Sequence, residues 1–230
     1  MENSLIQILV RSFESKDNQV KEQKEPGPFI TISREYGCRA GLLSEMIISQ
    51  IAQKGYAWQV VNKEILCHAA NELKMHPEKV RSVISDKNRG VLDEIIDATT
   101  SKYYKSDRKI RQTISNAVSS FARQGNVIII GRGGASITQG LSNGLHIRLV
   151  APSLWRLESL MTRHQLNREE ALKRMTSFDH KRYKLQRDYL KGMQDLDLLF
   201  DVKFNCSKVS LSEISKMIIQ LMEIRGMIQA

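Results

Sequence analysis

Long apolar runs, paired cysteines and blocks of like charge are all missing from this 230-residue sequence. No apolar run approaches the ~20 residues that a helix needs to cross a bilayer, so we expect a soluble protein without membrane contact. The three cysteines, Cys38, Cys67 and Cys206, lack the number and spacing of a disulfide framework or a zinc site. The N-terminus has an acidic residue at position 2 and no small-residue cleavage site, which disfavours export. These absences favour the cytoplasm.

The chain carries a formal net charge of +10, which a nucleic acid, an anionic membrane or a small polyanionic ligand could each explain. Basic residues are spread over 102–112, 156–174 and 180–191, mostly at helical spacing, without a block of five or six like charges. Basic clusters interleaved with aromatic residues, which are typical of nucleic-acid-binding proteins, are absent as well. Nucleic acid is therefore an unlikely class of partner, and most of these charges are interpreted as solvated helix faces.

The chain divides into a short N-terminal extension and one folded domain, since this length favours a single core. Residues 1–28 predict a short helix over 5–13 followed by a polar linker with two prolines. The domain spans 29–228, and a helical, strand-poor insertion covers about 63–124 of it.

Five short β-prone runs alternate with helical segments in the domain: PFITIS, AWQVV, NVIIIG, LHIRLVA and VKFNC. The helix that begins after Asn167 opens with a capping box completed by Glu170. This alternation predicts an α/β fold with three layers, in which helices cover both faces of a five-stranded parallel sheet. Ligands of such sheets bind at the carboxyl ends of the strands.

The first strand runs directly into a glycine-containing turn and then into a helix. Backbone N–H groups converge in such a turn, and the helix N-terminus adds about half a positive charge, so the turn suits a phosphate. Compared with G-x-x-x-x-G-K-[ST], Ala40 stands at the lysine position and Gly41 at the magnesium-binding hydroxyl. The pattern alone leaves open whether this is a phosphate-binding loop or an ordinary turn. Its residues are Ser33, Arg34, Glu35, Tyr36, Gly37, Cys38, Arg39, Ala40 and Gly41.

An ordered set of motifs runs from about residue 29 to 219: ITISREYGCRAG, VVNKEIL, NVIIIGRGG, LHIRLVAPSLWR, the D-x-x-R of Asp179 and Arg182, and FDVKFNCSKVSLSEI. This set resembles the cytidylate kinase-like family, a branch of the P-loop nucleoside monophosphate kinases. The resemblance implies a P-loop NTP hydrolase-like domain with a helical nucleotide-binding insertion and a lid at about 165–195. It also implies ATP with Mg²⁺ as phosphoryl donor and a mononucleotide such as CMP as acceptor, with no side chain binding the metal directly.

Within the turn, Arg34 and Glu35 match the distinctive Arg-Glu pair of the family, and Gly37 matches its loop glycine. Arg39, Ala40 and Gly41 stand where Gly, Gly and Arg are usual, so the one cationic side chain of the loop is displaced by two residues. This departure weakens the expectation of tight triphosphate binding.

On the acceptor side, Gly131 and Arg132 match the Gly-Arg pair whose arginine holds the acceptor phosphate in the family. A guanidinium group suits a phosphate, because its fork of N–H donors binds two oxygens at once. Gly133 and Asn62 stand where the family has aspartates, so base and sugar specificity stay open.

Phosphoryl transfer depends on alignment and on positive charge near the transferred group. The catalytic candidates are Arg132, Arg182 and Arg174, and Asp179 is expected to orient Arg182 within the lid. Arg163 and Arg187 complete the expected lid residues, although its position on the helix favours a solvated face for Arg187.

Three hypotheses follow. The first is a nucleoside monophosphate kinase-like phosphotransferase with a degenerate loop. The second is a nucleotide-binding regulatory pseudokinase, favoured by the missing lysine and hydroxyl. The third, a nucleic-acid-binding protein, rests only on the net charge. The sequence does not distinguish a monomer from a homodimer.

Overall fold

The structure is a computed structural model that describes residues 25–62, 108–190 and 195–229. The expected N-terminal helix, most of the linker, residues 63–107 of the expected insertion and 191–194 of the expected lid lie outside these residues. Among the helices of the described ranges, none has the length and apolar character that crossing a bilayer requires.

The core of the domain is one parallel sheet, as the sequence predicted. Its strands are β1 (Phe29–Arg34), β2 (Gln59–Val61), β3 (Val127–Ile130), β4 (Gly144–Val150) and β5 (Val202–Asn205). They lie in the order β2-β3-β1-β4-β5, and every neighbouring pair is parallel. The central strand β1 therefore has its carboxyl end between those of β3 and β4.

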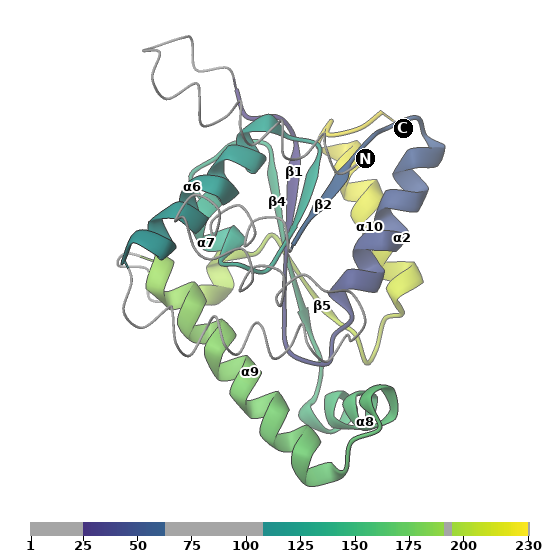
Figure 1. The fold of residues 1–230 in the computed structure, drawn as a ribbon. Helices are drawn as coiled ribbons and strands as arrows, with labels where there is room; N and C mark the ends of the chain where they lie inside the picture. The colour runs from purple at the N-terminus through teal and green to yellow at the C-terminus, as the bar shows by residue number, and fades with distance from the viewer. Residues whose placement is uncertain (1–24, 63–107, 191–194, 230) are drawn as a thin grey trace, which may run out of the picture.

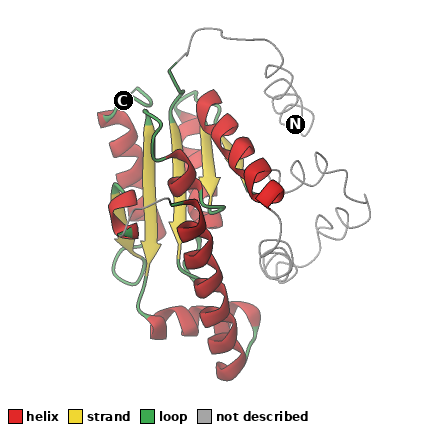
Figure 2. Cartoon of the chain, turned by 90° about the vertical axis from the view of Figure 1, so that its left-hand side faces the viewer, coloured by secondary structure: helices red, strands yellow, loops and turns green. Residues whose placement is uncertain are grey.

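Helices cover both faces of this sheet, which confirms the three-layer α/β fold (Figure 1). One face carries α2 (Ala40–Gln53) and α10 (Leu211–Ile224), and the other carries α6 (Arg108–Gln124), α7 (Gly134–Thr138) and α9 (Arg168–Tyr189). Helix α8 (Ser153–His164) contacts α9 and lies beyond the carboxyl ends of the strands (Figure 2). A short 3₁₀ helix, η2 (Leu196–Leu199), precedes β5.

Local sequence signals explain where two long helices begin. The side chain of Asn167 accepts a hydrogen bond from the Glu170 N–H at 2.9 Å, and the Glu170 carboxylate accepts one in return. The predicted capping box at the start of α9 is thus confirmed. Ser210 and Glu213 form an equivalent box at the start of α10.

The apolar core has two main parts, one on each side of the sheet, and a third part that joins the turn after β1 to the α8–α9 hairpin. In this third part, Tyr36 is buried with Leu157, Leu160 and Met175. Its ring also stacks on that of Phe178, with ring centroids 4.6 Å apart. The turn that follows β1 is therefore packed against α8 and against α9, the helix of the expected lid.

Two of the three cysteines, which are far apart in the sequence, lie side by side in the core between the sheet and α2 and α10. Cys38 and Cys206 are both buried free thiols. A hydrogen bond with Cys206, together with burial, raises the pKa of Cys38 well above its usual range. Sequence spacing could not reveal this contact, because the turn after β1 and the end of β5 meet only in the folded sheet.

Candidate functional site

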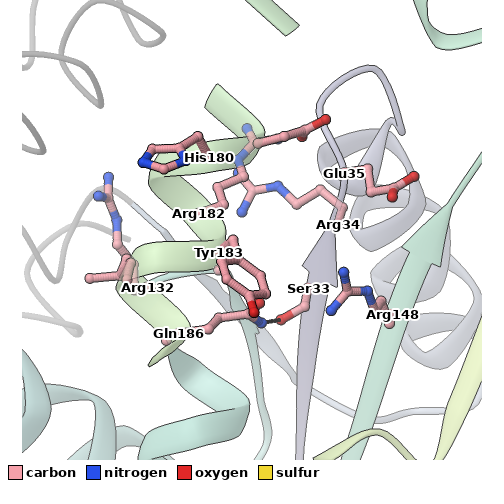
Figure 3. A pocket seen from close by; sticks show the side chains of 13 residues that line it. Ser33, Arg34, Glu35, Arg132, Arg148, His180, Arg182, Tyr183 and Gln186 are labelled. Carbon is pink, nitrogen blue, oxygen red and sulfur yellow. Dashed lines mark hydrogen bonds between the residues drawn. The ribbon is translucent and has the colours of Figure 1, made fainter. Parts of the chain in front are cut away.

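A cleft of about 330 Å³ opens at the carboxyl ends of the central strands, between the sheet and α9 (Figure 3). Its lining includes four guanidinium groups and two carboxylates. Guanidinium groups at strand ends are suited to bind phosphate or carboxylate groups. The lining residues come from β1, the turn after β3, β4 and α9: Ser33, Arg34, Glu35, Gly131, Arg132, Gly133, Arg148, Asp179, His180, Arg182, Tyr183, Leu185 and Gln186.

The turn after β3 places Arg132 in this cleft through three successive residues in the left-handed region. Gly131, Arg132 and Gly133 have φ values of 70°, 57° and 69°. A Cβ atom at Gly131 would lie 2.2 Å from Nη1 of Arg34, and one at Gly133 would lie 2.6 Å from the ring of Tyr189. The two glycines therefore allow Arg34 and Tyr189 to approach the turn.

Arg132 itself is unusual, because a long side chain in the left-handed region is uncommon and costs free energy. Only 8% of its surface is exposed. Asn62, Arg132 and Arg182 line a smaller hollow of about 30 Å³ next to the main cleft. The structure thus brings the expected acceptor residues of β2 and β3 together with the lid arginine.

A buried arginine, Arg156 of α8, joins the turn after β1 to α9. Its Nη1 donates to the carbonyl oxygen of Tyr36 at 3.1 Å and to the Asp179 carboxylate, and its Nε donates to the carbonyl oxygen of Ala151 at 3.0 Å. The same Nε lies 3.4 Å from Glu35 Oε2. Arg156 therefore pairs with both carboxylates of the cleft and balances one of their two negative charges, and the four guanidinium groups of the lining still leave an excess of positive charge for a ligand.

Asp179 has a second contact, with the expected phosphate loop. Its Oδ1 accepts a hydrogen bond from the backbone N–H of Tyr36 at 2.6 Å. The N–H of Glu35 donates to the carbonyl oxygen of Leu149, which continues the pairing of β1 with β4. The N–H groups of Cys38 and Ala40 donate to the carbonyl oxygens of Glu35 and Cys38, so four N–H groups of the loop are bound within the protein itself.

The structure divides the expected phosphate loop in two. Ser33, Arg34 and Glu35 line the cleft, whereas residues 36–41 lead to the N-terminus of α2 outside the cleft lining. There Arg39 is exposed and makes no side-chain cap hydrogen bond with α2. A Cβ atom at Gly41 would meet no atom within 4 Å. The N–H of Ala40, the first residue of α2, donates to the carbonyl oxygen of Cys38 at 3.0 Å. The next first-turn N–H groups, those of Gly41 and Leu42, have no partner within the helix, so an anion can bind there through the backbone.

The lid residues expected from the sequence do not all reach the cleft. Asp179 and Arg182 line it, and the guanidinium carbon of Arg182 lies 5.1 Å from the ring centroid of Tyr36. Arg174 does not line it, because eight residues of helix separate it from Arg182 by about 12 Å. Arg163 donates to the carbonyl oxygen of Gly37 at 3.2 Å.

Arg187 lies on the exposed side of α9. Its Nη1 donates to the hydroxyl of Tyr183 at 3.3 Å, and its guanidinium group stacks over the same ring. Arg187 does not line the cleft. Its position fits the solvated-face interpretation better than a role in the lid.

Sequence reasoning missed several lining residues, of which Arg148, Tyr183 and Gln186 are the most prominent. The signal for Arg148 was available, because a charged side chain in the middle of a predicted buried strand is unusual. The positions of Tyr183 and Gln186 depend on where α9 crosses the sheet, and no local pattern reports that.

Comparisons with known proteins agree with this architecture. The model of the cytidylate kinase-like family matches residues 29–208. A solved structure of an uncharacterized protein from Eubacterium ventriosum has the same fold, with a TM-score of 0.59 and 18% identity over 86% of this chain and 98% of that chain.

More remote matches include shikimate kinases from Acinetobacter baumannii, in complex with shikimate, and from Bacteroides thetaiotaomicron. Both have TM-scores of 0.48, with identities of 12% and 11% over 86% of this chain and 94% and 98% of theirs. A search of curated protein sequences returns no match.

Proposed function

The chain belongs to the cytidylate kinase-like family, and from this membership we propose that it transfers the γ-phosphoryl group of ATP to CMP or a related nucleoside monophosphate. The observation that carries the proposal is the convergence of Arg34, Arg132 and Arg182 at the carboxyl ends of the central strands. Positive charge at this place favours both the binding of an acceptor phosphate and the alignment of a transferring phosphoryl group.

On the acceptor side, Arg132 binds the phosphate of the mononucleotide, because it is held in a fixed backbone conformation and reaches into the cleft. Asn62 lies in the adjoining hollow, where its amide can donate to or accept from the nucleoside. Gly133 brings no carboxylate to the acceptor, and the Tyr189 ring occupies the space that a side chain at 133 would need. Because the family usually has an aspartate at position 133, we expect the base or sugar of the acceptor to be contacted by other groups in this protein.

On the donor side, the N-terminus of α2 and its preceding turn suit the phosphates of ATP through backbone N–H groups. Bound Mg·ATP would supply the phosphoryl group, with the metal neutralising phosphate charge. Among residues 25–62, 108–190 and 195–229, no group of three or more His, Cys, Asp or Glu is arranged to hold a metal. In the proposed complex, phosphate oxygens of ATP and water would supply most of the ligands of the magnesium ion, as is common for this metal.

Arg182 stabilises the charge that develops on the transferred group. Asp179, which the sequence led us to expect as its orienting carboxylate, is paired instead with Arg156 and with the N–H of Tyr36, so it fastens the turn after β1 to α9. Arg34 holds the opposite side of the cleft, where its guanidinium group packs against Gly131. These positive side chains supply the charge near the phosphates that a lysine at position 40 would provide in a standard phosphate-binding loop.

A second candidate function, a nucleotide-binding regulatory protein without turnover, is favoured by one observation. The Asp179 carboxylate occupies the N–H of Tyr36 in the very loop that would bind the donor phosphates. If this contact persists when nucleotide is present, binding without transfer follows.

Steady-state assays with Mg·ATP and a panel of CMP, dCMP, UMP, AMP and GMP test the proposal. We expect turnover with at least one acceptor and a loss of about 100-fold in kcat/KM for Arg132→Gly, since a charge-assisted contact to phosphate is lost. Glycine is chosen because it tolerates the left-handed backbone at position 132. Arg123→Met, which removes an exposed arginine in the last turn of α6, near the amino end of β1, should retain wild-type rates.

The alternatives give different results in the same experiment. Thermal stabilisation by nucleotides with no ADP formed from any acceptor would support the regulatory protein instead. Salt-sensitive binding to random oligonucleotides with no response to mononucleotides would indicate a nucleic-acid-binding protein.

A further inference from the structure

The sheet face beneath α9 is polar at the positions where a helix-covered parallel sheet is normally apolar. In β4, Leu145, Ile147 and Leu149 belong to the core under α2 and α10, so His146 and Arg148 point to the opposite face. In β1, Ile30 and Ile32 belong to that same core, so Thr31 and Ser33 also face α9. At the strand ends this polar stretch opens into the cleft, which Ser33 and Arg148 line, whereas Thr31 is only 1% exposed and lies outside the lining.

Most of these polar groups satisfy one another. Thr31 Oγ1 and His146 Nδ1 form a hydrogen bond of 2.8 Å. The hydroxyl of Ser33 accepts a hydrogen bond from Gln186 Nε2 of α9 at 3.0 Å. Ser33 retains its own proton, because it is the acceptor in this bond, and that proton can be donated into the cleft.

Arg148 is held less tightly than the other groups. Its Nη1 lies 4.0 Å from Asp197, and this carboxylate is bound by Lys203 Nζ at the much shorter distance of 2.6 Å. The hydrogen bond from Lys203 lowers the pKa of Asp197. The guanidinium group stacks over the Phe200 ring at 5.3 Å, and only 20% of the Arg148 side chain is exposed. This stacking orients the charge but leaves its N–H donors available to a ligand.

Arg148 and Arg132 lie on opposite sides of the cleft, with Ser33 and Arg34 between them (Figure 3). In the sheet, Arg148 pairs with Ser33 across β1 and β4, whereas Arg132 follows β3 on the other side of β1. Two strand spacings separate β3 from β4, which amounts to about 10 Å. Across this backbone distance the two side chains do not converge, since Figure 3 shows Arg132 and Arg148 on either side of Ser33 and Arg34, so one phosphate does not contact both.

We infer that Arg148, with the Ser33 hydroxyl, forms a second anion-binding subsite, and that the acceptor carries two separate anionic groups at opposite ends. The group at Arg132 is the acceptor phosphate of the proposed function, on which the inference rests. The group at Arg148 is a second phosphate or carboxylate that a simple nucleoside monophosphate lacks. The subsite thereby selects bis-anionic acceptors over mono-phosphorylated ones.

Equilibrium binding without ATP tests the inference separately from turnover. The probes are CMP and cytidine 3′,5′-bisphosphate, measured by calorimetry on the full chain. We expect the wild-type protein to bind the bisphosphate about 10- to 100-fold more tightly than CMP, as a charge-assisted contact provides. Arg148→Met keeps an unbranched side chain of similar length without the charge, and it should abolish this preference, measured as the ratio of the two affinities.

Two further variants complete the design. Arg148→Lys should restore part of the preference, because it restores a positive charge without the guanidinium fork. Arg123→Met should retain the full preference. The inference is overturned if the wild-type protein does not bind the bisphosphate more tightly than CMP, or if Arg148→Met keeps the preference. Failure of the proposed function would show instead as absent phosphoryl transfer in the assays with Mg·ATP, whatever the binding preference.

Discussion

Replacing Arg156 with methionine removes the guanidinium group that joins the turn after β1 to α9, while most of the apolar volume of the side chain stays. The variant loses two hydrogen bonds to backbone carbonyl groups, those of Ala151 at 3.0 Å and Tyr36 at 3.1 Å. Each such loss costs about 1 kcal/mol. The variant also leaves the carboxylates of Glu35 and Asp179 without their cationic partner, although each still accepts a hydrogen bond from a backbone N–H.

These carboxylates are each 28% exposed, so losing their partner costs less than the ~3–5 kcal/mol typical of a fully buried pair. With about 1–2 kcal/mol assigned to this loss, the total decrease in the free energy of unfolding is about 3–4 kcal/mol. In a chain of this size, such a decrease lowers Tm by about 6–16 °C. Urea denaturation and thermal scans of the wild-type protein, Arg156→Met and the exposed control Arg123→Met measure it.

A double-mutant cycle with Asp179→Asn separates the ion pair from the other contacts of Arg156. Because the two side chains are in direct contact, the double variant should lose about 1 kcal/mol less than the sum of the single variants. Additive losses, or a loss below about 1 kcal/mol for Arg156→Met alone, would refute the view that this arginine fastens the loop to α9.

Three further predictions concern other parts of the molecule. Gly133→Ala should lower the free energy of unfolding by about 1–3 kcal/mol, because the new Cβ would lie 2.6 Å from the Tyr189 ring and the backbone would keep a φ of 69°. Urea denaturation measures this loss, and an unchanged midpoint would contradict the prediction. In a variant whose third cysteine is replaced by serine, Cys38 and Cys206 should react with a thiol reagent at least ~100-fold more slowly in the folded protein than in denaturant, because burial keeps the reagent from both sulfur atoms. The raised pKa of Cys38 also keeps that residue in the unreactive thiol form. Equally fast labelling in the folded and denatured protein would contradict this packing. Burial lowers the pKa of His146, so the folded state binds a proton less readily than the unfolded state. The free energy of unfolding should therefore be highest above about pH 6.5, the usual pKa of histidine, and should fall as the pH decreases below it. Urea midpoints at pH 7.5 and 5.5 should differ less in His146→Gln, and an equal difference would rule out this histidine as the cause.

Much of the architecture follows from local patterns. The five β-prone runs correspond to β1 to β5, and the capping box at Asn167 marks the start of α9 within one residue. These features depend on residues close together in the sequence, where periodicity and capping act. The strand order has no such local signal, because it depends on how helices connect and pack on the two faces of the sheet.

The candidate site shows the same division. Arg34, Arg132 and Arg182 could be proposed because each belongs to a motif, and the structure brings all three into one cleft. Arg148 belongs to no motif, and its significance depends on the face of β4 that it occupies. Arg174 was proposed from helical spacing alone, and the geometry of α9 keeps it out of the cleft lining. Similarly, the contact of Cys38 with Cys206 follows from the strand order rather than from cysteine spacing.

The most direct test of the account is the transfer of the γ-phosphoryl group of ATP to a mononucleotide, followed by chromatography of the products. The account predicts that ADP and a nucleoside diphosphate form in equal amounts with the wild-type protein and Arg123→Met, and that both fall by about 100-fold in Arg132→Gly. Equal product formation by Arg132→Gly and the wild-type protein, or no diphosphate from any acceptor, would contradict it.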